Sequence, residues 1–360
     1  MINVTQTYLP PFDEYAKQLK RAWDKGWITN NGELLLELEQ MLKQYLGVKH
    51  LFFCNNGTIV LQMALKAFNI KKEVITTPFS YVATTTAILW ENCTPVFVDI
   101  NNVDYNVDAN KIEAAITSET EAILVTHVYG NPCNIEKIGE IARKYNLKVI
   151  YDGAHAFGVN YKNKSLLSYG DISTCSFHAT KLFHTVEGGA IITNDDEIAK
   201  KLMLYRQFGH VYDDYLSVGI NAKNSEFHAA MGVTLLPVVP KIIERRRILS
   251  DLYDSHLKKI GLIRPEALPE TQYNYGYYSI VFNTEVELLR VRAGLANLEI
   301  NTRRYFYPSL NELPYLTKKY SCPISEDISK RVLCLPLYPD LELSSVEHIC
   351  SVIKSELSKS

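Results

Sequence analysis

Short apolar runs alternate with amphipathic segments over the first two thirds of the chain. The runs are four to six residues long and rich in Val, Ile and Phe, which favours buried β-strands. They lie at Leu51–Cys54, Glu73–Thr76, Pro95–Asp99, Ala122–Thr126, Lys148–Tyr151, Ile172–Phe177 and Gly189–Thr193. Strands that alternate with helices are typical of a mostly parallel sheet covered on both faces. The pattern therefore predicts an α/β fold with a seven-stranded sheet.

Segments with helical periodicity fill several of the gaps between these runs. They lie at Thr58–Phe68, Ser80–Trp90, Ala109–Ile116 and Ile135–Tyr145. Two further helical patterns, Asp13–Lys25 and Leu34–Leu46, precede the first predicted strand. We expect these helices to flank the sheet.

The pattern changes after about Ala230. A long helical stretch covers Lys241–Lys259, a strand-like run follows at Tyr277–Phe282, and helical patterns return at Glu285–Leu298 and Ser344–Leu357. This order predicts a smaller C-terminal α+β domain. We place the larger domain, with its N-terminal helices, at residues 1–235 and the smaller one at residues 236–360.

Composition narrows the class of protein. A hydrophobic fraction of 47% and a net charge of −2 are those of an ordinary globular protein, with no basic surface for nucleic acid. The seven cysteines are odd in number and form no C-x-x-C pair, so neither a disulfide framework nor a metal site is indicated. The start of the chain does not resemble a signal peptide, and no run approaches the length of a membrane helix. We expect a cytoplasmic protein.

Three polar clusters follow predicted strands directly. They are Asn55–Thr58, Asp152–His155 and Ser176–Lys181. In an open α/β sheet, ligands gather at the carboxyl ends of the strands. The shared position of the clusters is the first indication of a binding site.

Each cluster has an ordinary interpretation when it is taken alone. Gly57 and Thr58 can hold a phosphate at a helix start, or they can form a simple turn with Thr58 as N-cap. Asp152 can pair with a protonated heterocycle, or it can cap a helix or form a structural ion pair. Lys181 can be a carbonyl-reactive amine with a depressed pKa, or a surface lysine. Glu187-Gly188-Gly189 suggests a tight return of the chain near this lysine.

Together, the three clusters point to one cofactor. A phosphate cradle, an acid for a pyridinium nitrogen and a Schiff-base lysine are the parts that pyridoxal phosphate requires. A nucleotide triphosphatase is disfavoured because the chain has no G-x-x-x-x-G-K-[ST] segment. A dinucleotide dehydrogenase is disfavoured because G-x-G-x-x-G is missing after the first strand.

Eight ordered motifs carry a resemblance that covers nearly the whole chain. They lie at residues 29–32, 56–58, 77–84, 95–99, 127–132, 152–156, 176–181 (followed closely by 187–189) and 219–221, and Cys334–Pro339 matches the usual ending. With these motifs the sequence resembles the DegT/DnrJ/StrS aminotransferases, of the aspartate aminotransferase-like fold type I. The resemblance implies pyridoxal phosphate as cofactor, with pyridoxamine phosphate formed during turnover.

The resemblance also implies roles for individual residues. Lys181 would form the Schiff base and move the proton, Asp152 would pair with the pyridine nitrogen, and Tyr81 would stack on the ring. The remaining cofactor-binding positions are Gly57, Thr58 and Ser176 at the phosphate, His155 at the ring hydroxyl, and Asn221, which would complete the phosphate site of a neighbouring subunit. A homodimer with shared active sites follows. His178 and Glu187 are expected to support the site or to have a structural role.

Three positions depart from the family pattern. Gly153 stands where Ala is usual, Val186 where Gly is usual, and Asn56 where Ser is usual. None of these changes removes a group that the chemistry needs. They put in doubt only the fine shape of the pocket.

The resemblance implies a substrate class. Glutamate would supply the amino group and a nucleotide-linked keto-sugar would accept it, and the opening of the chain looks most like the branch that acts at carbon 4 of dTDP-4-keto-6-deoxy-D-glucose. The resemblance also implies a role in deoxyamino sugar and lipopolysaccharide O-antigen biosynthesis. Arg303 and Arg304 could meet the diphosphate, or they could be solvated surface residues.

Several alternatives stay open. Amination at carbon 3 and a UDP- or GDP-linked sugar involve the same chemistry. A sugar dehydratase of the same family would carry histidine in place of Lys181, and a scaffold protein that has lost activity would be expected to lose Lys181, Asp152 or Ser176.

Overall fold

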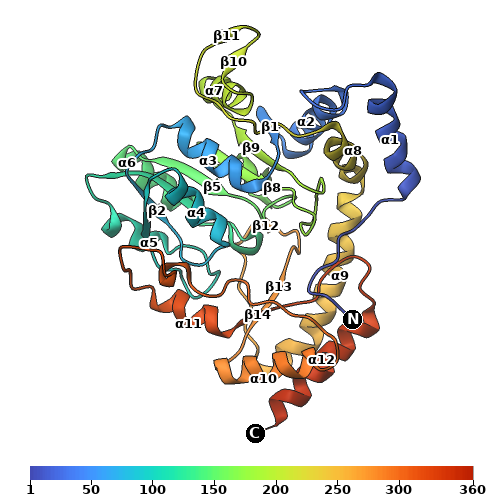
Figure 1. Ribbon diagram of the computed structural model, residues 1–360. Coiled ribbons are helices and arrows are strands. Elements are labelled where there is room, and N and C mark those ends of the chain that lie inside the picture. The colour runs from blue at the N-terminus through green and yellow to red at the C-terminus, as the bar shows by residue number, and fades with distance from the viewer. Residues whose placement is uncertain (360) are drawn as a thin grey trace.

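The computed structural model describes residues 1–359, which form a central seven-stranded sheet flanked by helices (Figure 1). The strand order is β1-β9-β8-β5-β4-β2-β3. The bounds are β1 His50–Cys54, β2 Glu73–Thr76, β3 Thr94–Phe97, β4 Thr120–Thr126, β5 Lys148–Asp152, β8 Ile172–Ser176 and β9 Gly189–Thr193. β9 runs antiparallel to both of its neighbours and the other pairings are parallel. The predicted α/β class and all seven predicted strands are confirmed.

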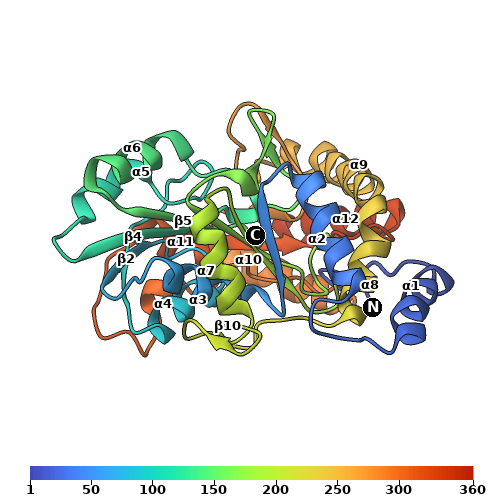
Figure 2. The same cartoon turned by 90° about the horizontal axis from the view of Figure 1, so that it is seen from above.

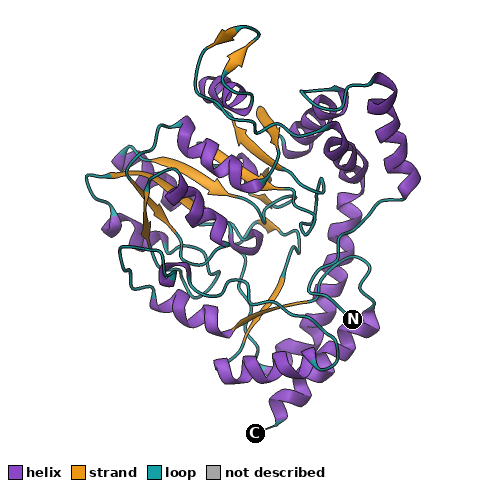
Figure 3. Cartoon of the chain, in the orientation of Figure 1, coloured by secondary structure: helices purple, strands orange, loops and turns teal. Residues whose placement is uncertain are grey.

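Helices cover both faces of the sheet (Figures 2 and 3). α3 (Gly57–Ala67), α4 (Val82–Trp90) and α7 (Asp196–Arg206) share one buried apolar cluster with Ile150 and Ile172 of the strands. α5 (Ala109–Ile112) and α6 (Ile135–Tyr145) pack on the opposite face against Val149, the neighbour of Ile150. Successive strand residues thus enter different cores, which explains why the strands are apolar throughout.

A third set of helices packs beside the β1 end of the sheet. α1 (Phe12–Lys25), α2 (Glu33–Leu46) and α8 (Glu226–Leu235) form it, and Leu51 and Phe53 of β1 belong to its core. The sequence pattern predicted α1 and α2 to within one residue at their starts. It did not predict α7 or α8, although the N-cap residues Asp195 and Ser225 mark where they begin.

The C-terminal elements form their own apolar cluster. α9 (Val239–Leu257), α10 (Glu285–Ala296) and α12 (Leu343–Ser358) pack on the antiparallel pair β13 (Tyr278–Val281) and β14 (Val332–Leu335). α11 (Pro323–Arg331) leads into β14. The division between residues 235 and 236 stays a prediction. The chain crosses that point through the short 3-10 turn Leu236–Val238, which joins α8 to α9.

The joined helix Glu226–Ile260 is long and apolar enough, by length and composition, to cross a membrane. The sequence pattern predicted no such stretch, because no continuous run approaches the roughly 18 apolar residues that a membrane helix needs. Slightly more than half of the most apolar window is buried inside the fold. The core helix of a globular protein has this character.

Two small sheets lie outside the central sheet, and the sequence pattern did not predict them. β6 (Asn160–Tyr161) pairs with β7 (Lys164–Ser165) and with β12 (Thr271–Gln272), while β10 (His210–Val211) and β11 (Asp214–Tyr215) form a projecting hairpin (Figure 1). Strands of two residues carry too little periodicity to be recognised.

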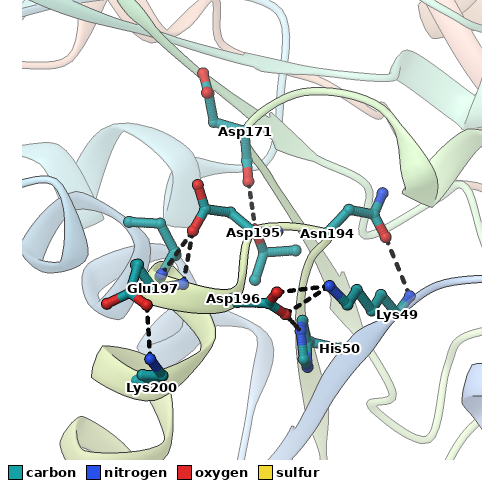
Figure 4. Close-up of polar contacts among 10 residues, drawn as sticks. Lys49, His50, Asp171, Asn194, Asp195, Asp196, Glu197 and Lys200 are labelled. Carbon is teal, nitrogen blue, oxygen red and sulfur yellow. Dashed lines mark hydrogen bonds and ion pairs between the residues drawn. The ribbon is translucent and has the colours of Figure 1, made fainter.

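A polar cluster joins the start of β1 to the start of α7 (Figure 4). The Asp195 carboxylate accepts hydrogen bonds from the amides of Glu197 and Ile198, at 2.8 and 3.0 Å, and so caps α7. The next residue, Asp196, contacts Lys49 and His50, each at 2.7 Å. These contacts are exposed and fix the end of the sheet opposite to the polar clusters.

An N-terminal segment, residues 2–8, connects distant parts of the fold. Ile2 pairs with Ile300, and the carbonyl of Val4 accepts a hydrogen bond from Leu337 N at 3.1 Å. Farther along, Thr7 Oγ1 donates to the carbonyl of Ala179 at 3.0 Å. The segment therefore ties the C-terminal elements to the loop that carries Lys181.

Asp99 also connects two parts of the fold. It is buried two residues after β3, and its carboxylate accepts hydrogen bonds from Ile324 N (3.1 Å) and Ser325 N (3.0 Å) at the start of α11. The N-cap residue of α11, Cys322, makes no side-chain hydrogen bond to the helix. Asp99 is therefore a cap supplied from more than 200 residues away.

We expect Asp99→Ala to lower the free energy of unfolding by about 2–3 kcal/mol, because one buried and one partly buried amide lose their acceptor. Urea titration followed by circular dichroism measures the change. Asp195→Ala is the matched control, since it removes an exposed local cap and should cost only about 1 kcal/mol. Equal losses for the two variants would show that Asp99 acts as an ordinary exposed cap.

Candidate active site

The ends of the central strands bring the three polar clusters to one edge of the sheet. Gly189 of β9 pairs with Cys54 of β1 on one side and with Ser176 of β8 on the other. On the next strand, Asp152 pairs with Thr174 of β8 and with Thr126 of β4. The three predicted clusters are thus neighbours in space.

The first cluster forms a cradle between β1 and β8. A Cβ on Gly57 would lie 2.8 Å from Cβ of Ser176, so only glycine allows this close approach. The N-cap of α3 is Asn56 rather than Thr58, since the Asn56 side chain accepts from Thr58 N (3.0 Å) and Ile59 N (2.8 Å). The hydroxyls of Thr58 and Ser176 and the first amide of the helix stay available for an anion.

Asp152 is buried at the end of β5, and its two oxygens have different partners. Oδ2 accepts from Thr84 Oγ1 at 2.7 Å, and Oδ1 accepts from Ala154 N at 3.0 Å. Thr84 belongs to a chain of buried hydroxyls with Ser80 (2.8 Å), which in turn contacts Thr126 (2.7 Å). This chain fixes the orientation of the carboxylate.

Lys181 lies in the loop after β8, half-buried. Its Nζ donates a hydrogen bond to Tyr277 Oη at 3.2 Å. Burial alone lowers the pKa of the Lys181 ammonium, but Tyr277 and Asp152 raise it, and the net shift is upward. The depressed pKa that the sequence suggested is therefore wrong for this arrangement, because these two neighbours outweigh the desolvation.

His155 lines the same small pocket as Ser176, Lys181 and Tyr277. Its ring is buried, stacks on Phe306 at 5.5 Å between centroids, and meets Tyr277 edge-on at 4.9 Å. Burial and the nearby Lys181 hold the pKa of His155 well below its usual range, so the ring is neutral. Its Nδ1 is buried and has no partner among residues 1–359.

The remaining predicted positions lie at the rim. Tyr81 precedes α4 and is 56% exposed, next to the buried Ser80. Asn221 is exposed beside Asn55, whose side chain donates to the Asn221 carbonyl at 3.3 Å. The role of Asn221 in a neighbouring subunit stays a prediction. His178 and Glu187 form an exposed contact of 3.6 Å near the cradle.

Arg303 and Arg304 differ in their surroundings. Arg304 pairs with Glu285 at 2.7 Å and donates to the Lys330 carbonyl at 2.8 Å, so its guanidinium is engaged within the fold. Arg303 is exposed and lies 5.5 Å from the ring centre of Tyr305. Of the two, Arg303 remains available to an anion from solution.

The structure shows the local geometry at two of the positions that depart from the family pattern. A Cβ on Gly153 would lie 2.3 Å from Leu167 Cδ2 and 2.8 Å from the Thr174 carbonyl, so alanine does not fit here without a shift. Val186 adopts φ +67°, a left-handed conformation that is strained for a β-branched residue and natural for glycine.

Sequence reasoning missed two residues of this site. Thr84 lies inside the motif at residues 77–84, but only its 2.7 Å contact with Asp152 gives it a role. Tyr277 lies 96 residues after Lys181 and was interpreted as part of a strand. No local pattern distinguishes a tyrosine that contacts a lysine from one that packs in a core. Among residues 1–359 no group of three His, Cys, Asp or Glu side chains could hold a metal ion.

Comparison with known proteins agrees with this geometry. The model of the DegT/DnrJ/EryC1/StrS aminotransferase family matches residues 12–354. The chain is 41% identical to a dTDP-4-amino-4,6-dideoxy-D-glucose transaminase of Shigella dysenteriae, over 98% of both chains. It is 34% identical to the GDP-perosamine synthase of Escherichia coli O157:H7, over 96% of both.

A solved structure agrees with the sequence comparisons. The crystal structure of DesI in the presence of its TDP-sugar product superposes with a TM-score of 0.94 at 30% identity, covering 99% of this chain and 93% of DesI. The predicted family and fold type are confirmed. The chain belongs to the DegT/DnrJ/EryC1/StrS aminotransferase family, whose cofactor is pyridoxal phosphate.

Proposed function

We propose that this chain transfers an amino group from glutamate to carbon 4 of dTDP-4-keto-6-deoxy-D-glucose, with pyridoxal phosphate as cofactor. The observation that carries the proposal is the meeting of Lys181, Asp152 and the Gly57–Ser176 cradle at one edge of the sheet. The substrate is supported by the 41% identity to a transaminase named for the corresponding amino sugar.

The residues present fit this cofactor. Gly57 lies so close to Ser176 that a side chain at position 57 would not fit. Because glycine has none, the cradle between the two residues stays open. Asp152 is a buried carboxylate with no cation bonded to it, which suits a protonated ring nitrogen. The unpartnered Nδ1 of His155 is a buried polar atom that a ring substituent would satisfy.

Each residue then has a distinct task. Gly57, Thr58 and Ser176 hold the phosphate, Asp152 keeps the ring nitrogen protonated, and Tyr81 covers one face of the ring. The bound cofactor supplies an electron sink for the carbon that loses its proton. Lys181 holds the cofactor and then moves the proton between the substrate carbon and the cofactor.

We also propose a cytoplasmic homodimer in which Asn221 reaches the partner's phosphate site. Large exposed apolar side chains support an interface, among them Phe12 (76%) and Trp23 (72%) on α1 and Tyr212 (90%) on the projecting hairpin. A monomeric mass in light scattering would contradict this arrangement.

The experiment is a series of visible spectra of the purified protein. Pyridoxal phosphate is added first, then glutamate, then one keto-sugar at a time: dTDP-4-keto-6-deoxy-D-glucose, its 3-keto isomer, and the GDP- and UDP-linked 4-keto sugars. We expect glutamate to bleach the band of the bound cofactor and the dTDP-linked 4-keto sugar to restore it at the highest rate. Mass spectrometry of the amino sugar confirms the transfer.

The other outcomes are equally informative. Restoration by the GDP-linked sugar alone would keep the aminotransferase chemistry and replace the substrate, as the 34% identity to a GDP-perosamine synthase allows. Consumption of a keto-sugar without any glutamate would favour the dehydratase. A folded protein that binds the cofactor but gives no spectral change with any donor would favour the inactive scaffold.

A further inference from the structure

Tyr277 is the hydrogen-bond partner of the central lysine. Its Oη accepts from Lys181 Nζ at 3.2 Å, and this is the only hydrogen bond that the lysine side chain makes within residues 1–359. The tyrosine comes from the C-terminal part of the chain, directly before β13, whereas Lys181 follows β8 of the central sheet. The contact therefore joins two separate parts of the fold.

The backbone before Tyr277 is held unusually firmly. Asn274 is buried, accepts a hydrogen bond from Gly276 N at 2.9 Å, and donates to the carbonyls of His155 (2.9 Å) and Phe157 (2.8 Å). The loop that follows Asp152 and the segment that carries Tyr277 are thus fastened together. Buried polar side chains with several partners fix one geometry, since any shift leaves a group unpaired.

A buried arginine fastens the same segment from the other side. Arg246 of α9 is 3% exposed and donates through Nη1 to the carbonyls of Gly276 (3.2 Å) and Leu337 (3.0 Å). Burial lowers the pKa of Arg246 to about 10, because no carboxylate pairs with it. Burying this cation costs free energy. Its hydrogen bonds hold the backbone beside Tyr277 in place.

The ring of Tyr277 is enclosed by aromatic neighbours. His155 lies at 4.9 Å, Tyr129 at 5.5 Å and Tyr305 at 5.9 Å between ring centroids. The aromatic contacts restrict the ring, and its hydroxyl is the group that points to the lysine. The geometry is that of a fixed acceptor for the amino group of Lys181.

We propose that Tyr277 is a positioning residue that holds the free Lys181 amine within reach of the substrate carbon, so that the neutral amine takes up one proton, stays in place as the ammonium form, and then gives that proton up again. The proposal rests on the proposed function, because the lysine is free only while the cofactor carries the amino group. Tyr277 accepts a hydrogen bond and keeps its own proton, so no bond to carbon forms or breaks at this residue.

The charge balance supports this role. Burial lowers the pKa of Lys181, and the Tyr277 hydroxyl opposes it by stabilising the ammonium form. Removing the hydroxyl should therefore lower the pKa of Lys181, so that the amine becomes neutral at a lower pH. A less basic amine takes up the transferred proton more weakly, so the proton transfer should slow.

The test compares Tyr277→Phe with Tyr278→Phe. Tyr278 is the next residue along, points to the opposite side, and donates its hydroxyl to Asp254 at 2.7 Å, away from Lys181. The full-length protein without cofactor is treated with formaldehyde and cyanoborohydride over a range of pH, and methylation of Lys181 is measured by peptide mass spectrometry. We expect the labelling midpoint of Tyr277→Phe to move down by about one pH unit, with no shift in Tyr278→Phe.

A second readout uses the loaded enzyme. Tyr277→Phe should lower kcat by about 10- to 100-fold at an unchanged KM for the keto-sugar, and the band of the bound cofactor should persist. Equal midpoints and equal kcat in the two variants would overturn the proposal. If Tyr277→Phe fails to fold, Asn274→Ser, which only loosens the segment, should shift the midpoint in the same direction by less, and no shift would overturn the proposal.

The two proposals can fail separately. The labelling experiment needs no cofactor and no sugar, so a shifted midpoint would stand even if the keto-sugar were misassigned. Conversely, amino transfer by the unmodified protein with an unshifted midpoint would remove Tyr277 and leave the proposed function intact.

Discussion

Replacing Lys181 with alanine is expected to lower kcat for amino transfer by at least about 1,000-fold. General acid–base groups contribute about 10²–10⁴-fold, and this residue also forms the covalent link to the cofactor. The band of the bound cofactor should move to that of an unlinked aldehyde. Stopped-flow spectra of the glutamate half-reaction measure the loss directly.

A matched control distinguishes the loss of the reactive amine from the loss of one positive charge. Lys164, the exposed first residue of β7, has no ion pair within residues 1–359, and Lys164→Ala should keep full activity. Added methylamine should restore part of the activity of Lys181→Ala, since a small amine can take the vacated space. A Lys181→Ala variant that transfers amino groups within tenfold of the unmodified rate would refute the assignment of the lysine.

The second large effect is expected at Asp152. Asp152→Asn keeps the shape of the side chain but removes the negative charge opposite the ring nitrogen. Breaking a buried ion pair in this way costs about 3–5 kcal/mol, which corresponds to a fall in kcat of about 150- to 5,000-fold. Cofactor affinity, measured by fluorescence titration, should fall as well.

Asp171→Asn is the control for this variant. Asp171 lies at the opposite end of the same two strands, where its carboxylate accepts from Val149 N at 2.8 Å (Figure 4 shows this residue beside the start of α7). We expect its kcat within about threefold of the unmodified protein, because surface substitutions away from such sites have small effects. If both variants lost activity equally, the loss at Asp152 would reflect a damaged sheet.

The sheet was predictable because its signals are local. Each central strand is a short β-branched run, such as Val149-Ile150-Tyr151, whose neighbours enter two different cores. The order of the strands does not follow from such runs, since pairing is decided by contacts over long separations. The same holds for the place of α8, because no local pattern reveals that it packs on α2.

The candidate site was predictable only where its residues follow strands or belong to a motif. Asp152, Ser176 and Lys181 met that condition. Tyr277 did not, since its role arises from Asn274 and Arg246, which fasten its backbone from other segments. For the same reason the sequence could not distinguish Arg303 from Arg304, although only Arg304 pairs with Glu285.

Two helix caps were also not predictable from the sequence. Asn56, rather than the expected Thr58, caps α3. Asp99 caps α11, which lies more than 200 residues farther along the chain.

The position of β9 between β1 and β8 has a consequence for biosynthesis. β1 has no other neighbour in the sheet, so its backbone stays unpaired until β9, about 140 residues farther along, has been made. At about 5–20 residues per second, this interval is on the order of ten seconds. During that time Leu51 and Phe53 lie on an open strand edge, which is prone to aggregation. The nascent chain is therefore expected to need chaperone protection until the cofactor cradle closes.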